Sequence, residues 1–287
     1  MRDADGAEPA RTSPSAIDFA VADARDEAFT VLGGRADLGF VLFCDHASNA
    51  FPREYGTLGM PAAELERHIA YDIGAAGVVR RIAAATGVPA ILSHYSRLLI
   101  DLNRGPDDPT LIMRLSDGAV VPGNRHLGDD ERRARVARFY DPYHAAAGRM
   151  IDRCLDTGHP PAILSVHTFT PSWRGDARPW HASILWDKDP RLAHALLDGL
   201  RADPALVVGD NEPYSGRLAG DSMWRHGTMR GLAHAIVEIR QDLVAAEDGQ
   251  IAWAERLATI MCRLMACDRI GPLLRRIEHH GSHTDAR

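Results

Sequence analysis

The sequence predicts an α/β domain, in which buried strands alternate with helices. Short apolar runs such as residues 39–45 and 88–93 are typical of strands buried on both faces of a parallel sheet. Between these runs, residues 62–86 repeat apolar side chains at three- and four-residue spacing, which predicts a helix with one buried stripe. The 287 residues show no internal repeat and no clear linker, so we expect a single α/β domain.

The other elements are predicted from similar local patterns. Residues 1–15 are rich in Ala, Pro, Ser and Asp without an apolar period, which predicts a disordered tail. Residues 16–270 are expected to form the domain, and residues 271–287 a polar C-terminal tail. Strands are predicted at residues 39–45, 88–93, 97–102, 161–166, 181–186, 206–209 and 232–239. Helices are predicted at residues 62–86, 130–156, 190–201 and 246–267.

Two helix boundaries have clear local signals. Pro61 fits the start of the first helix, and Gly87 is expected to stop it. Asp129 is expected to cap the second helix. Before the second helix, residues 105–129 are predicted to form a long loop rich in Asp and Gly, and loops of this length are commonly functional or mobile.

The composition narrows the class of protein. With a net charge of −6 at pH 7, the chain lacks the basic balance of a general nucleic-acid binder. No apolar run approaches the roughly 20 residues of a membrane helix, and the N-terminus lacks a signal-peptide core. None of the four cysteines forms a C-x-x-C pair, so a cysteine-based zinc site is not expected. We expect a cytoplasmic protein, and the oligomeric state stays open.

Polar residues follow or end four of the predicted strands. They are His46, Asn103 with Arg104, His167 and Glu238. Because the carboxyl ends of parallel strands meet at one edge of a sheet, we expect these side chains to lie close together. Two histidines and a carboxylate are the ligands of many catalytic zinc sites, and a further carboxylate can act as general base. An arginine at such an edge can form a paired hydrogen bond with a substrate carboxylate.

Five separated motifs carry a resemblance to a known family. They are DHASN at 45–49, HIAYDIG at 68–74, SRLLIDLNR at 96–104, SVHTFTP at 165–171 and VEIRQDL at 237–243. In this order they resemble the N-formylglutamate amidohydrolase family, from about residue 38 to about residue 245. The resemblance implies a hydrolase that cleaves the amide of an N-formyl or N-acyl amino acid carrying a carboxylate.

A more distant resemblance connects these motifs to the zinc carboxypeptidases. The matching residues are His46, Asp101 to Arg104, Ser165 to His167 and Glu238 to Arg240. This resemblance implies a phosphorylase/hydrolase-like three-layer sandwich, with a mixed, mostly parallel sheet between helices. It also implies one zinc ion bound by His46 and His167, Glu238 as general base, and a substrate carboxylate bound by Asn103 and Arg104.

The third metal ligand departs from the carboxypeptidase pattern. Asn49 stands where that family has a glutamate, and asparagine is a poor zinc ligand. We therefore assign Asp72, on the predicted helix 62–86, as the third ligand. Asn49 stays an alternative, and so does His68, which lies four residues before Asp72 and would share its helix face.

The full hypothesis is a zinc-dependent amidohydrolase, and each assignment has a simpler alternative. Arg97 either stabilises the oxyanion or is a salt-bridged strand residue. Tyr214 contacts substrate or belongs to a turn without chemistry. Glu238 could pair with Arg240 two residues along the strand, and Arg104 could tie down the acidic loop. The rival functions are a metallopeptidase, another N-acyl amino acid deacylase, or a non-catalytic protein that binds a small anion.

Overall fold

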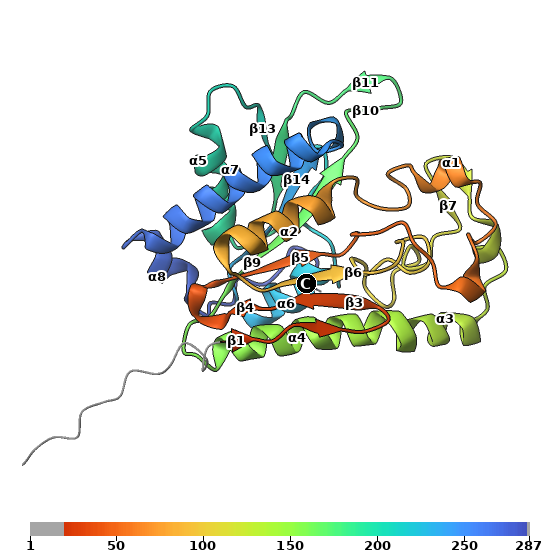
Figure 1. Cartoon of the computed structure of the whole chain (residues 1–287), viewed down its shortest axis with the longest axis horizontal. Coiled ribbons are helices and arrows are strands. Elements are labelled where there is room, and N and C mark those ends of the chain that lie inside the picture. The colour runs from red at the N-terminus through yellow and green to blue at the C-terminus, as the bar shows by residue number, and fades with distance from the viewer. Residues whose placement is uncertain (1–19, 286–287) are drawn as a thin grey trace, which may run out of the picture.

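The computed structural model describes residues 20–285 as an eight-stranded sheet between two layers of helices (Figure 1). The three-layer arrangement predicted from the resemblance is therefore confirmed. The predicted tail at residues 1–15 lies outside the described residues. Among the described helices, none combines the length and the apolar character that crossing a bilayer requires.

The sheet is mixed and mostly parallel. Its strands run in the order β13-β12-β14-β9-β5-β6-β3-β2. The four central strands β14, β9, β5 and β6 are parallel to one another, whereas β12 is antiparallel to β14 and β3 to β6. The bounds are β2 Ala24–Arg25, β3 Phe29–Leu32, β5 Phe40–Cys44, β6 Ala90–Ser93, β9 Ala162–Phe169, β12 Ala182–Leu185, β13 Val208–Asp210 and β14 His234–Arg240.

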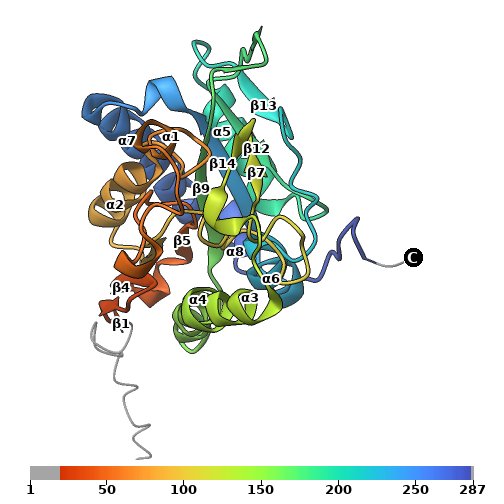
Figure 2. The ribbon, with the colours of Figure 1, turned by 90° about the vertical axis from the view of Figure 1, so that its right-hand side faces the viewer.

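Three small hairpins stand apart from this sheet. They pair β1 (Ala20–Val21) with β4 (Gly34–Arg35), β7 (Leu115–Ser116) with β8 (Ala119–Val120), and β10 (Ser172–Trp173) with β11 (Asp176–Ala177). The hairpin β7–β8 lies inside the stretch expected to be a long loop. Figure 2 looks onto the side of the molecule that carries β7 and α1 (Ala62–Leu65).

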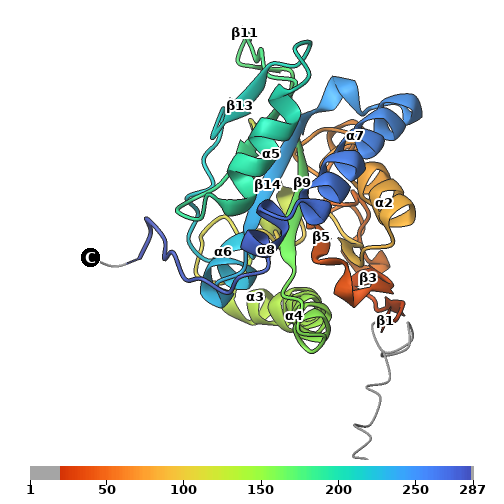
Figure 3. The same cartoon turned by 90° about the vertical axis from the view of Figure 1, so that its left-hand side faces the viewer.

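Helices cover both faces of the sheet, as Figure 3 shows. The helices on one face are α2 (Ala75–Thr86), α5 (Arg191–Arg201), α7 (Glu247–Ala266) and α8 (Ile270–Leu274). Those on the other face are α4 (Asp141–Leu155) and α6 (Ser222–His226), with α3 (Asp129–Arg135) leading into α4. Successive strand side chains alternate between the faces, so Leu42 packs into the first core and Phe43 into the second.

The predicted helix 62–86 is wrong in its middle part. Only α1 and α2 are helical, and residues 66–74 form turns between them. Gly74 adopts a left-handed conformation with φ of 84°, which glycine tolerates and which interrupts the helix. The backbone N–H of Asp72 donates to the carbonyl of His46 at 3.0 Å instead of to a helical neighbour. Asp72 therefore lies in a turn, and the expectation that it shares a helix face with His68 is incorrect.

The predicted strand at residues 97–102 is also wrong. This stretch consists of turns, and the Asp101 N–H donates to the carbonyl of Leu111 at 2.8 Å. Its leucines are apolar because Leu98 and Leu99 are fully buried, not because the segment pairs in a sheet. The second helix also differs: a π-helical turn at Val136–Tyr140 separates α3 from α4, and the N-cap is Gly128, not Asp129.

The described C-terminal residues pack onto the domain. The polar tail predicted at residues 271–287 begins within the short helix α8. Beyond it, the Glu278 N–H donates to the carbonyl of Gly231 at 2.7 Å, and Ser282 and His283 donate to Asp187.

Candidate active site

Parallel strands bring the predicted site residues to one edge of the sheet. His46 is the second residue after β5, His167 lies near the end of β9, and Glu238 is the neighbour of His167 across the sheet in β14. The turn that carries Asp72 is held against His46 by the backbone bond described above. These four residues line one cavity of about 530 Å³. The expected convergence of His46, His167 and Glu238 is therefore present, although the predicted strand 97–102 is not.

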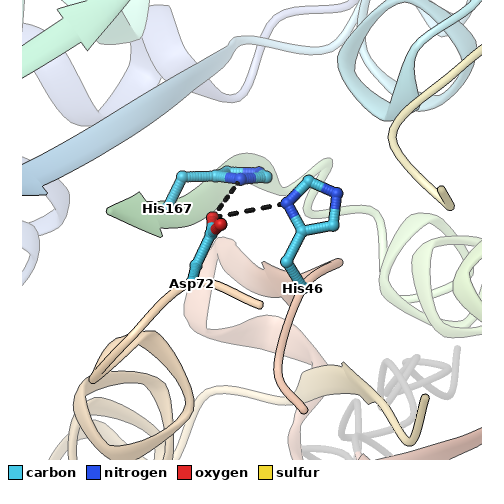
Figure 4. A group of neighbouring side chains, drawn as sticks. All are labelled: His46, Asp72 and His167. Atoms are coloured by element: carbon cyan, nitrogen blue, oxygen red, sulfur yellow. Dashed lines mark hydrogen bonds and ion pairs between the residues drawn. The ribbon is translucent and has the colours of Figure 1, made fainter. Parts of the chain in front are cut away.

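His46, Asp72 and His167 form a buried cluster suited to a metal ion (Figure 4). One donor atom of each lies within 4.8 Å of the other two. Asp72 Oδ2 lies 3.3 Å from His46 Nδ1 and 2.8 Å from His167 Nδ1. Each of the three side chains is at most 4% exposed. Two imidazoles and a carboxylate match the donor set of a catalytic zinc site.

The nitrogens of the two imidazoles that face away from the cluster have their own hydrogen-bond partners. His46 Nε2 donates to Asp101 Oδ1 at 2.8 Å, and His167 Nε2 donates to Ser165 Oγ at 3.0 Å. The Ser165 hydroxyl in turn donates to Asp45 at 3.4 Å. These bonds fix the orientation of both rings with Nδ1 directed at Asp72, as in histidines that bind metal. The donor set and its hydrogen bonds therefore fit a divalent cation.

The electrostatics of the cluster favour positive charge between the imidazoles. Burial alone would lower the pKa of His167, but its hydrogen bonds with Asp45 and Asp72 raise that pKa to about 10. Burial likewise opposes the charge of Asp72, yet His46 and His167 hold its pKa far below the usual range. A bound cation would supply the same positive charge that the proton supplies here.

Glu238 is a buried carboxylate beside the cluster, and it has a free oxygen. Its side chain is 9% exposed, and Oε2 has no hydrogen-bond partner among the described residues. Burial raises its pKa to about 7, where a carboxylate can both accept and release a proton. The alternative pairing with Arg240 is not formed, because Arg240 pairs with Asp242 at 2.8 Å.

Four further predicted residues line the same cavity: Arg97, Asn103, Arg104 and Tyr214. Arg97 donates to Asp101 Oδ2 through Nε and Nη2, at 3.1 and 2.7 Å, while Nη1 lies 3.5 Å from Asp72 Oδ1. Arg97 is therefore salt-bridged, and it also faces the cluster.

The adjacent pair Asn103 and Arg104 is held in place by neighbouring polar groups. Asn103 Oδ1 accepts the Ser222 N–H at 3.1 Å, and Arg104 donates to Thr110 Oγ1 at 3.2 Å. Arg104 therefore anchors on Thr110, and the described residues show no ion pair between it and the acidic residues of the loop.

The two alternative metal ligands lie outside the cluster. Asn49 donates through Nδ2 to the carbonyl of Leu65, the last residue of α1, at 3.0 Å. His68 is partly exposed and lies 3.5 Å from Asp117 in the β7–β8 hairpin. Neither side chain is a member of the metal-binding group in residues 20–285.

Sequence reasoning missed three buried acids around the site. Asp45 and Asp101 were within the motifs, and their positions next to His46 and before Asn103 are the signals that could have identified them. Asp221 had no such signal. It lines the cavity at 1% exposure, burial raises its pKa to about 7, and its Oδ2 has no partner in the described chain.

The fold and this cluster define an α/β protein with a candidate metal centre at the edge of its sheet. A family model for N-formylglutamate amidohydrolase matches residues 38–245, so the chain belongs to that family of hydrolases. The match spans the five motifs, and the predicted family is thereby confirmed. A curated N-formylglutamate deformylase from Pseudomonas putida is 24% identical over 196 residues, which are 60% of this chain and 70% of the relative.

Two solved structures have the same fold. A gene product of Agrobacterium tumefaciens shares 34% identity with a TM-score of 0.76, over 82% of this chain and 94% of its own. The N-formylglutamate amidohydrolase of Ralstonia eutropha JMP134 shares 21% identity with a TM-score of 0.63, over 87% and 98% of the two chains.

Proposed function

We propose that the protein is a zinc-dependent amidohydrolase that cleaves the amide of an N-formyl or N-acyl amino acid such as N-formylglutamate. The observation that carries this proposal is the placement of a buried His/Asp/His cluster next to Glu238 in one cavity. The family of the chain and its curated deformylase relative support the choice of substrate.

One zinc ion would be held by His46, Asp72 and His167, whose donor atoms already lie together. When bound, it would supply Lewis-acid chemistry, lowering the pKa of a water molecule and polarising the amide carbonyl. The hydrogen bonds from the imidazoles to Asp101 and Ser165 would hold both rings in the orientation that this requires.

Glu238 would act as general base and then as general acid. It takes a proton from water as the water oxygen bonds to the amide carbon. It passes the proton to the nitrogen as the C–N bond breaks, which for an N-formyl substrate releases formate and the free amino acid. The unpartnered Oε2 and the pKa near 7 both suit a group that exchanges protons at neutral pH.

The other cavity residues would bind and orient the substrate. Arg104 and Asn103 would hold the substrate carboxylate, since a guanidinium and an amide N–H both donate to carboxylate oxygens. Arg97 would face the developing oxyanion with Nη1, the nitrogen turned toward Asp72. Tyr214, 43% exposed at the cavity wall, would contact the substrate from the solvent side.

The test compares metal content and deformylase activity in the wild type, His167→Ala and Glu238→Gln. We expect His167→Ala to lose zinc and activity together. Glu238→Gln should keep zinc but lose roughly 10²- to 10⁴-fold in kcat. Full activity in Glu238→Gln would exclude the proposed base, and stoichiometric zinc in a His46→Ala, His167→Ala double variant would exclude the proposed site.

Metal content and activity, measured with a wider set of substrates, also separate the rival functions. A metallopeptidase or another deacylase would retain zinc but prefer peptides or other N-acyl amino acids in a substrate screen. A protein that only binds a small anion would show no turnover in any of these assays, and it would bind no zinc.

A further inference from the structure

Asp221 is a buried acid of the cavity, and only one of its two oxygens has a hydrogen-bond partner. Oδ1 accepts the Trp224 N–H at 2.6 Å and so caps α6, whereas Oδ2 has no partner among residues 20–285. Within that part of the chain, Glu238 is the one other acid with a buried oxygen that lacks a partner, and it lines the same cavity. Glu238 has a role in the proposed reaction. Asp221 has no role in that reaction, although an unpaired buried carboxylate is costly.

The cavity wall between Glu238 and Asp221 is aliphatic. Ile236 lies two residues before Glu238 in β14, so both side chains project from the same face of the sheet, about 7 Å apart along the strand. Leu185 in β12 is the cross-strand partner of Ile236, and both of these buried side chains line the cavity. The helix α6, which Asp221 caps, packs against β14. The cavity therefore extends from Glu238 over two aliphatic side chains and reaches a carboxylate.

Asp221 also lies next to the residues assigned to the substrate carboxylate. The N–H of the adjacent Ser222 donates to Asn103 Oδ1 at 3.1 Å, and the Ser222 hydroxyl donates to the carbonyl of Leu102 at 3.2 Å. In the proposed function, Asn103 holds the carboxylate and Glu238 faces the amide. The α-carbon of the substrate carries one further large substituent, which is the amino-acid side chain. The aliphatic wall beside Glu238 and the acid beside Asn103 are positioned to receive that side chain.

We propose that Asp221 binds a positively charged group at the end of the substrate side chain, so that the cavity selects N-acyl amino acids with a basic side chain. A lysine side chain has this form, because an aliphatic stem carries a terminal ammonium that donates hydrogen bonds. A substrate carboxylate at the same place would meet Asp221 as a like charge. This inference rests on the proposed amidohydrolase function. It keeps the reaction, but it assigns a positive charge to the side chain that is negative in N-formylglutamate.

The test measures kcat/KM of the zinc-loaded protein for N-formyl-L-lysine and N-formyl-L-norleucine, whose side chains share an unbranched four-carbon stem and differ in the ammonium. The wild type should prefer the lysine substrate roughly 10- to 100-fold, which is the typical gain from a hydrogen bond between charged groups. Asp221→Asn should reduce this preference to about twofold or less, because the amide carries no charge. Asparagine keeps an oxygen for the cap of α6 and is as good a cap as aspartate, so this variant should fold.

Asp117→Asn is the matched control. Asp117 is also an acid of the cavity wall, but it is partly exposed and pairs with Arg67 at 2.5 Å. This variant should keep the wild-type preference for the lysine substrate. N-formyl-L-glutamate completes the substrate series, and the wild type should cleave it less efficiently than N-formyl-L-lysine because of the like charge at Asp221.

A wild type that favours norleucine or glutamate over lysine would overturn the proposal, and so would a lysine preference that survives in Asp221→Asn. Calorimetric titration with L-lysine and L-norleucine separates the side-chain subsite from the reaction, because neither compound has an amide to cleave. Lysine binding that depends on Asp221, in a protein without deformylase activity, would retain the subsite and reject the proposed function. Deformylase activity without a preference for lysine would retain the proposed function and reject the subsite.

Discussion

Replacing Asp101 by asparagine is expected to weaken metal binding without touching a ligand. Asp101 Oδ1 accepts from His46 Nε2 at 2.8 Å and from the Asn103 N–H at 2.9 Å, while Oδ2 accepts two bonds from Arg97. An amide nitrogen must replace one of these oxygens. An amide nitrogen facing Arg97 would forfeit two bonds from a permanent cation, whereas one facing His46 would forfeit only the Asn103 N–H bond, so the amide nitrogen is expected to face His46.

In that arrangement the amide donates to His46 Nε2, and the imidazole proton moves to Nδ1. Nδ1 is the atom that lies 3.3 Å from Asp72 and would bind zinc, and a protonated nitrogen cannot be a ligand. Changes in groups that support metal ligands typically cost 10- to 100-fold in affinity, which corresponds to about 1.4–2.7 kcal/mol. We expect a loss of this size for Asp101→Asn.

The assay is zinc affinity by competition with a chromophoric chelator at fixed pH. Asp221→Asn is the control, because Asp221 is a buried acid of the same cavity that has no described hydrogen bond to either imidazole. It should bind zinc like the wild type. Wild-type affinity in Asp101→Asn would refute the argument that this carboxylate sets the tautomer of His46.

Two further predictions concern the fold around the site. Gly74→Ala should destabilise the protein by about 1 kcal/mol or more and also weaken zinc binding, because a Cβ there would stand 2.3 Å from the Val244 carbonyl at a φ of 84°. Urea unfolding measures the change in stability, and the chelator assay measures the change in zinc affinity. An unchanged stability and an unchanged affinity would contradict the role of the turn that contains Gly74. Burial lowers the pKa of His144 to about 3 and of His226 to about 4, so at pH below 6.5 the unfolded chain binds protons that the folded chain does not. Each imidazole should therefore contribute about 2 kcal/mol less to stability at pH 5 than at pH 7. In urea titrations at both pH values, His226→Gln should change in stability from pH 7 to pH 5 less unfavourably than the wild type, and equal changes in the two proteins would show that the pair is not responsible.

The parts of the site that follow strands were predictable from the sequence. The apolar runs before His46 and at His167 and Glu238 have lengths typical of buried parallel strands, and the observed sheet places all three at one edge. The motif HIAYDIG drew attention to Asp72 as the third metal ligand, although the periodicity of the segment had placed this residue on a helix.

The errors arise where burial mimics a periodic pattern. Ile69 is buried by packing of a turn, and its spacing of four residues from Ile73 continued the helical stripe of α2. Leu98 and Leu99 are buried in turns and resemble a strand for the same reason. The position of Asp221 in the cavity wall depends on long-range packing that local sequence does not encode.

The three cluster residues come from segments that are 26 and 95 positions apart along the chain. An unfolded polypeptide therefore cannot present them together, and zinc should bind the native state far more strongly than the denatured one. Each tenfold excess of free metal over its dissociation constant then adds about 1.4 kcal/mol of resistance to unfolding. The melting temperature of this protein should rise with zinc concentration, and a chelator should reverse that gain.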